Sequence, residues 1–145
     1  MEQSNLYYFF QHSHSLLRWL VLAFGLIAFA MHLLGWINGR HYRKLDNRMG
    51  LAFLVALDLQ LVLGLALHLI LSPFTRALFS GEPFMKDPLQ RFYILEHPIL
   101  MLTAIALAHI GRSRQRRSDA SHAKFRLGTI FFGLALILIL AGIRW

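Results

Sequence analysis

Long apolar runs separated by short polar stretches make up most of this chain. The runs cover about residues 16–37, 49–71, 88–111 and 127–143. Each is close to the ~20 residues that an α-helix needs to cross the hydrocarbon core of a bilayer. The connections between them are short, which favours antiparallel neighbours. The pattern therefore predicts an all-α integral membrane protein, an up-down-up-down four-helix bundle that forms a single domain over residues 1–145.

The start of the third span and the end of the second carry the clearest local signals. Asp87 is a suitable N-cap, Pro88 fits the first helical position, and Gln90 follows three residues after the cap. The second span should stop at Ser72–Pro73, because a proline disfavours helical backbone at the residue before it. Between these signals, residues 72–86 are the longest stretch that we expect to be non-helical.

Positive charge is concentrated in two of the three connections. Of the 15 Lys and Arg residues, ten lie within residues 38–48 and 112–126. Short loops rich in Lys and Arg stay in the cytoplasm, so both chain termini should be extracytoplasmic. Anionic headgroups then account for the net charge of +8, and we expect no nucleic acid partner. Residues 1–10 lack a basic segment and a small-residue cleavage site, so we expect no removable signal peptide.

The composition limits the chemistry that the bundle can support. The chain is 57% hydrophobic and contains no cysteine. Disulfides, iron–sulfur clusters and thiolate-bound zinc are therefore excluded, and any metal ligands must come from His, Met, carboxylates or the backbone.

Polar side chains recur at one end of the predicted bundle. The extracytoplasmic end should collect side chains from the first three spans, namely His12, His14, Arg18, His68, Glu96 and His97. Such groups are costly in an apolar layer unless they have partners. Two neutral imidazoles are suitable axial ligands for a haem in an apolar bundle. We therefore expect a haem or metal site here. The fourth span has no ionisable group between Leu127 and Ile143 and should only close the bundle.

The sequence does not decide which two histidines would be the ligands. Counted from the apolar boundaries, His68 and His97 lie at similar depth, within about 3 Å along the helix axis. His14 matches this depth only if the first helix begins earlier, which it could do from Asn5 onward. Pro98 frees a carbonyl in the preceding turn and can re-aim His97. Arg18, one turn from His14, could hold a haem propionate or extend to lipid headgroups.

The other polar positions have more modest interpretations. Asp58 should be costly if ionised within a span, so we expect it to be protonated or paired with His32 or His109; a proton-relay role is an alternative. His32 and His109 form a weaker candidate for a second site at the cytoplasmic end. His41 and His122 lie in the cytoplasmic loops, where we expect only solvation.

Several segments resemble those of a known group of proteins. They are His14–Trp19, Asp58–Leu65, Glu96–Pro98 and Ile143–Trp145, which together span most of the chain. They are similar to small bacterial four-span membrane proteins labelled cytochrome b-like, whose architecture resembles the cytochrome b561 class. This resemblance implies a b haem held by two histidines, quinone-linked electron transfer and the bacterial cytoplasmic membrane. It favours His14 and His97 as the ligands.

Three functions follow from these observations. The first is a membrane cytochrome b that passes electrons between quinol and a partner near the outer face. The second is a copper-binding protein that uses the outer histidines and Met101. The third is a cofactor-free accessory subunit of a larger membrane complex, whose polar groups only fix helix packing.

Overall fold

The computed structural model describes residues 2–71, 80, 81 and 83–145. Its helices are α1 (Glu2–Ile37), α2 (Lys44–Leu65), the π-helical turn η1 (Ala66–Leu71), the 3-10 turn η2 (Phe84–Lys86), α4 (Pro88–Arg91), the π-helical turn η3 (Phe92–Glu96), α5 (His97–Arg117) and α6 (Ser121–Ala141). Since η1 continues α2, and α4, η3 and α5 follow one another directly, these elements form four long rods. The predicted all-helical fold is confirmed for the described residues.

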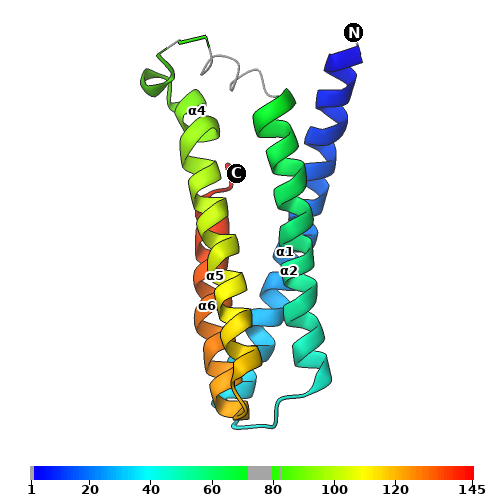
Figure 1. Ribbon diagram of the computed structural model, residues 1–145, viewed down its shortest axis with the longest axis vertical. Helices are drawn as coiled ribbons and strands as arrows, with labels where there is room; N and C mark the ends of the chain where they lie inside the picture. Colours follow the sequence, from blue (N-terminus) through cyan, green and yellow to red (C-terminus); the bar gives the residue numbers. More distant parts are fainter. Residues whose placement is uncertain (1, 72–79, 82) are drawn as a thin grey trace.

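The four rods alternate in direction along the bundle (Figure 1). Both chain termini lie toward one end, which we call the terminal end; the 38–43 and 118–120 connections form the opposite end, which we call the arginine end. Helix α1 packs on α2 and α6, and α5 packs along α6. All four rods are long and apolar enough to cross a membrane. Large apolar side chains face outward, as in Leu16, Ile70 and Ile137, and are suited to contact with lipid.

Two helices extend beyond the predicted spans. Helix α1 already begins at Glu2, so the histidines near the start of the first span lie inside a long helix. The third rod continues past Gly111 to Arg117. Gly111 is a packing residue instead of a helix end, because a Cβ there would lie 2.3 Å from Cβ of Phe131 on α6. The arginines that follow are good helix formers and extend the helix beyond its apolar part.

The predicted signals at the other helix ends have different outcomes. The side chain of Asp87 accepts hydrogen bonds from the backbone N–H of Leu89 (2.8 Å) and Gln90 (3.4 Å), which confirms it as the N-cap. The second rod is helical to Leu71, where η1 ends. The predicted stop at Ser72–Pro73 and most of the following loop lie outside the described residues.

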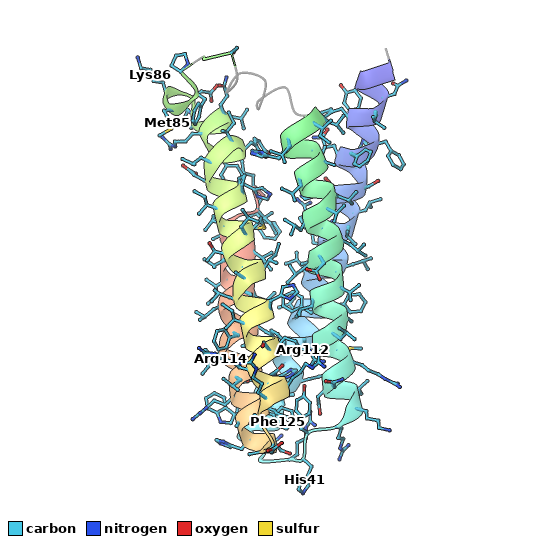
Figure 2. The ribbon with its side chains drawn as sticks, viewed as in Figure 1. His41, Met85, Lys86, Arg112, Arg114 and Phe125 are labelled. Atoms are coloured by element: carbon cyan, nitrogen blue, oxygen red, sulfur yellow. The ribbon has the colours of Figure 1, made fainter. Side chains whose placement is uncertain are left out.

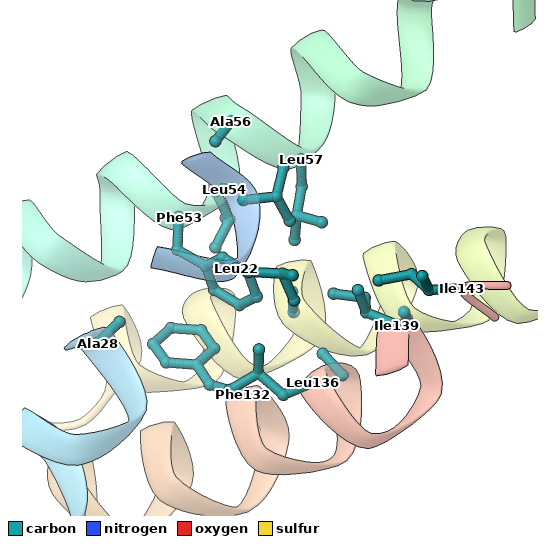
Figure 3. Packing of buried hydrophobic residues seen from close by; sticks show 14 residues of the cluster. Leu22, Ala28, Phe53, Leu54, Ala56, Leu57, Phe132, Leu136, Ile139 and Ile143 are labelled. Atoms are coloured by element: carbon teal, nitrogen blue, oxygen red, sulfur yellow. The ribbon is translucent and has the colours of Figure 1, made fainter. Parts of the chain in front are cut away.

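The apolar core lies in the middle of the bundle, where side chains from all four rods meet (Figure 3). Phe53 of α2 and Phe132 of α6 are fully buried and pack edge to face, with ring centres 5.6 Å apart. Ala28, Ala104 and Ala108 are also fully buried, which lets the helix backbones approach closely. This core fixes how the rods are rotated about their axes, and therefore which side chains face inward at either end.

A buried ion pair organises the connection between α1 and α2. Asp46 is 1% exposed and accepts two short hydrogen bonds from the guanidinium of Arg40, at 2.6 and 2.7 Å. It also accepts the backbone N–H of Arg43 at 2.8 Å and so caps the start of α2. Arg40 in turn donates to the carbonyl of Met31 and lies over the ring of Phe125. The hydrogen bonds to Asp46 raise the pKa of Arg40 above its ordinary value.

Candidate haem site at the terminal end

Two of the predicted site residues meet across the bundle at the terminal end. The imidazole rings of His14, on α1, and His97, at the start of α5, have centres 6.3 Å apart and planes inclined at 71°. Each ring is partly buried. Helix α1 packs on α2 and α6, and α5 packs along α6, so the two rings come from helices that are not packed side by side.

His97 is positioned by a local break in the helix. The π-helical turn Phe92–Glu96 comes directly before it, and the N–H of His97 reaches back to the carbonyl of Phe92, five residues away. Pro98 has no N–H for the carbonyl of the preceding turn, which favours such a break. The side chains of Arg91 and Glu96 pair at 2.7 Å across the turn. A regular α-helix brings residues three or four apart together, whereas this pair is separated by five.

The end of α6 holds the ring of His97. Its Nδ1 lies 2.7 Å from the carbonyl oxygen of Gly142. A carbonyl can only accept, so Nδ1 carries the hydrogen and Nε2 keeps a lone pair when the ring is neutral. This carbonyl is available because Gly142 is the C-cap of α6, where backbone acceptors have no partner within the helix.

The sequence analysis missed this contribution of the fourth rod. We expected that span only to close the bundle, because it has no ionisable side chain between Leu127 and Ile143. Nδ1 of His97 instead donates to the backbone carbonyl of Gly142, and a pattern of side chains does not predict such a contact. The available signal was Gly142 itself, since glycine is common where helices end and leave carbonyls unpaired.

His14 is positioned from α2. The side-chain amide of Gln60 donates to the backbone carbonyl of His14 at 3.0 Å. One turn further along α2, Gly64 leaves room for the imidazole, because a Cβ there would lie 3.3 Å from Cε1 of His14. Nδ1 of His14 is buried and has no hydrogen-bond partner among the described residues. The ring therefore has its place fixed by backbone and packing, while its Nδ1 has no competing partner among the described residues.

His68 lies near this pair. It is half-buried on η1, one turn beyond Gly64, and interacts electrostatically with His97. The ring contact made by His97 across the bundle is with His14. Counting residues from the apolar boundaries favoured His68 as the residue at the depth of His97. Because α1 begins at Glu2, His14 also lies within a helix, at the depth of His97.

Arg18, which was expected near a haem edge, and two other arginines of the terminal end have distinct surroundings. Nε of Arg18 is buried without a hydrogen-bond partner in the described chain, and its guanidinium lies 5.3 Å from the ring centre of Trp19. Arg91 is engaged by Glu96, and Arg144 lies over the ring of Phe92. Of the three, Arg18 is the one with a buried donor that has no partner among the described residues.

The other polar residues of the terminal end do not complete a metal-binding cluster in the described part of the chain. His12 is exposed on α1. Among the described residues, no group of three or more His, Asp or Glu side chains could hold a metal ion. A pair of imidazoles is nevertheless sufficient for the axial positions of a haem.

The histidines nearer the arginine end of the bundle have other partners. His109 Nε2 lies 2.8 Å from Asp58 Oδ1, so the expected pairing of Asp58 is with His109. His32 is fully buried and donates from Nδ1 to the carbonyl of Ala28 at 2.6 Å. Because His32 and His109 are engaged by different partners, they do not form the second site that the sequence suggested for them.

His122 corrects one expectation. It lies in the first turn of α6 and its Nε2 accepts a hydrogen bond from Nε1 of Trp36 at 3.0 Å, so it is more than a solvated loop residue. His41 is exposed, as expected.

Comparisons of the chain with profiles of known protein families, with curated proteins and with solved structures find no match.

Proposed function

We propose that this chain is a membrane-embedded, b-type cytochrome-like electron-transfer protein in which His14 and His97 hold the haem iron. The placement of these two imidazoles on α1 and α5, which are not packed side by side, with ring centres 6.3 Å apart, carries the proposal. An imidazole nitrogen binds a metal at about 2 Å, so the centres of two rings trans to each other on one iron lie about 6 Å apart. The observed separation meets this requirement.

The surroundings of His97 provide independent support. Histidines that bind metals usually donate their other ring N–H to a carboxylate or a backbone carbonyl, which fixes the tautomer and the ring orientation. The hydrogen bond from Nδ1 of His97 to the carbonyl of Gly142 has this form and leaves Nε2 for the metal. His14 offers a partly buried ring beside Gly64, where a bulky side chain would occupy the same space.

Arg18 would serve the polar edge of the cofactor. A haem carries propionates that need cations, and Arg18, one turn from His14, has a buried donor without a partner in the described part of the chain. A b haem, when bound, supplies one-electron transfer. The protein contributes the ligands, the orientation of the rings and an apolar bundle around them.

The direction of electron flow rests on the predicted topology and on the resemblance. If the arginine end is cytoplasmic, the His14–His97 pair lies near the outer face of the bacterial cytoplasmic membrane. The resemblance to cytochrome b-like proteins supports quinol as the electron donor and a redox partner near that face. We place the chain in this membrane as a multi-pass protein.

The optical spectrum of the purified protein tests this function. We expect a Soret band, a sharp α band after reduction with dithionite, and about one haem per chain by pyridine haemochrome assay. Colourless protein with stoichiometric copper would instead support the metal-binding alternative. Colourless, metal-free protein that co-purifies with a larger complex would support the accessory-subunit alternative.

Alanine substitutions of His14 and His68 separate the two candidate ligand pairs. We expect His14→Ala to lose the low-spin spectrum, because the ring facing His97 is removed. We expect His68→Ala to retain the wild-type α band and haem content, with at most a small shift in reduction potential. Both variants should be compared at equal folded protein, measured by circular dichroism. Loss of the low-spin spectrum in His68→Ala alone would assign the axial position to His68.

A further inference from the structure

The bundle contains a cleft near its arginine end that the proposed haem function does not use. It lies between α2 and α5, has a volume of about 700 Å³ and is lined at one end by Arg112, Arg116 and Arg117. Arg112 donates to Oδ1 of Asn47 across the cleft at 2.7 Å, and Figure 2 shows its side chain directed toward α2. A smaller cleft of about 210 Å³ continues from it and adds Lys124.

The charge of this cleft is unbalanced. Neither cleft is lined by Asp or Glu, and no carboxylate pairs with Arg112, Arg116 or Arg117 in the part of the chain that the structure describes. Arg116 and Arg117 are exposed, while the partner of Arg112 is a neutral amide. Clustered, unneutralised guanidinium groups favour an anion, and phosphate oxygens suit their geometry.

The other end of the same cleft is apolar. Leu51 and Leu54 line it, and the exposed side chains of Val55 and Leu59 continue the apolar surface along α2. His109 closes the lining on α5, where Asp58 satisfies its Nε2. The cleft therefore has a cationic end at the membrane boundary and an apolar wall that runs into the membrane. An occupant that matches both ends must be an amphiphile with an anionic head.

We infer that this cleft binds one anionic phospholipid. The phosphodiester would lie against Arg112, Arg116 and Arg117, and an acyl chain would lie along Leu51 and Leu54. Basic pockets between transmembrane helices are suited to such headgroups. A free phosphate would use only the arginines and leave the apolar wall uncovered. The inference does not depend on the haem site, which lies in the other half of the bundle.

Native mass spectrometry of delipidated protein in detergent tests this assignment. The probes are dioleoylphosphatidylglycerol, dioleoylphosphatidylcholine with the same chains, and inorganic phosphate. We expect one tightly bound phosphatidylglycerol per chain, much weaker phosphatidylcholine binding, and no retention of phosphate. Removing two arginines near the headgroup, in Arg116→Gln/Arg117→Gln, should weaken phosphatidylglycerol binding roughly 30-fold.

The control variant removes the same charge from the same end of the bundle. Arg114 lies on α5 over the ring of Phe131 and Arg126 is exposed on α6, and neither lines the cleft. Arg114→Gln/Arg126→Gln should bind phosphatidylglycerol like the wild type. If the first double variant does not fold, Ser113→Glu places a carboxylate in the lining and should weaken binding similarly. Equal losses in the cleft and control variants, equal binding of both lipids, or retention of phosphate alone would overturn the assignment.

Discussion

Replacing His97 by alanine should abolish the pigment of the purified protein, with loss of both the Soret band and the reduced α band. His97 is common to both candidate ligand pairs, and its ring nitrogen Nδ1 is held by the backbone carbonyl of Gly142. Without it, the imidazole of His14 has no counterpart across the bundle. We expect haem content to fall from about one per chain to near zero, as measured by pyridine haemochrome assay.

The His97→Ala variant also removes a hydrogen bond that ties α5 to the end of α6, so a matched variant is needed. His97→Asn keeps a side-chain N–H that can donate to Gly142 while removing the ring nitrogen that would bind iron. It should be colourless and should melt close to the wild type. His41→Ala and His122→Ala should retain full pigment, since both residues lie at the arginine end. A wild-type spectrum in His97→Asn would remove the central residue of the haem proposal.

Replacing Asp46 by alanine should produce the largest loss of stability in the chain. The carboxylate is 1% exposed and accepts hydrogen bonds from two guanidinium nitrogens of Arg40. It also caps α2 by accepting the N–H of Arg43. Removing one partner of a buried ion pair costs about 3–5 kcal/mol, because the other charge is left uncompensated. Arg40 is 29% exposed and can recover some hydration, so we expect about 3 kcal/mol. The free energy of unfolding can be measured by titration with sodium dodecyl sulfate in mixed micelles.

Two comparisons identify the origin of this loss. Asp119→Ala removes an acidic residue from an exposed connection and should change the free energy of unfolding by less than about 0.5 kcal/mol. The double substitution Arg40→Met/Asp46→Leu removes both charges and should be less destabilising than Asp46→Ala alone. A double variant that is as unstable as the single one would attribute the loss to the cap of α2.

The sequence was sufficient to predict four helices that are long and apolar enough to cross a membrane. Apolar runs of bilayer length and short connections predicted the four rods, and Asp87 followed by Pro88 marked the true start of the third. These features are local, since they depend on hydrophobicity and capping within one segment. The ends without such signals were less accurate, as at Glu2 and Gly111, because helices continue beyond the apolar stretch wherever the residues permit it.

The site was less accessible to sequence reasoning. Depth counting assumes regular helices, but η1 and η3 each widen a helix beside a candidate ligand and change where His68 and His97 point. The Gly142 carbonyl and the Asp46–Arg40 pair were also missed. The first belongs to the backbone, and the second joins residues counted only as loop charges. Such partners are set by tertiary packing, which a single sequence does not display.

The wide turn before His97 has a consequence for how this protein can change over evolutionary time. A π-helical turn accommodates one more residue than an α-helical turn of the same kind, so η3 behaves as an absorbed single-residue insertion. A change of one residue in the segment before His97 could therefore be absorbed at this turn. The imidazole of His97 is anchored from α6, so such a change would rotate the segment from Asp87 to Arg91 about the helix axis and leave the imidazole in place.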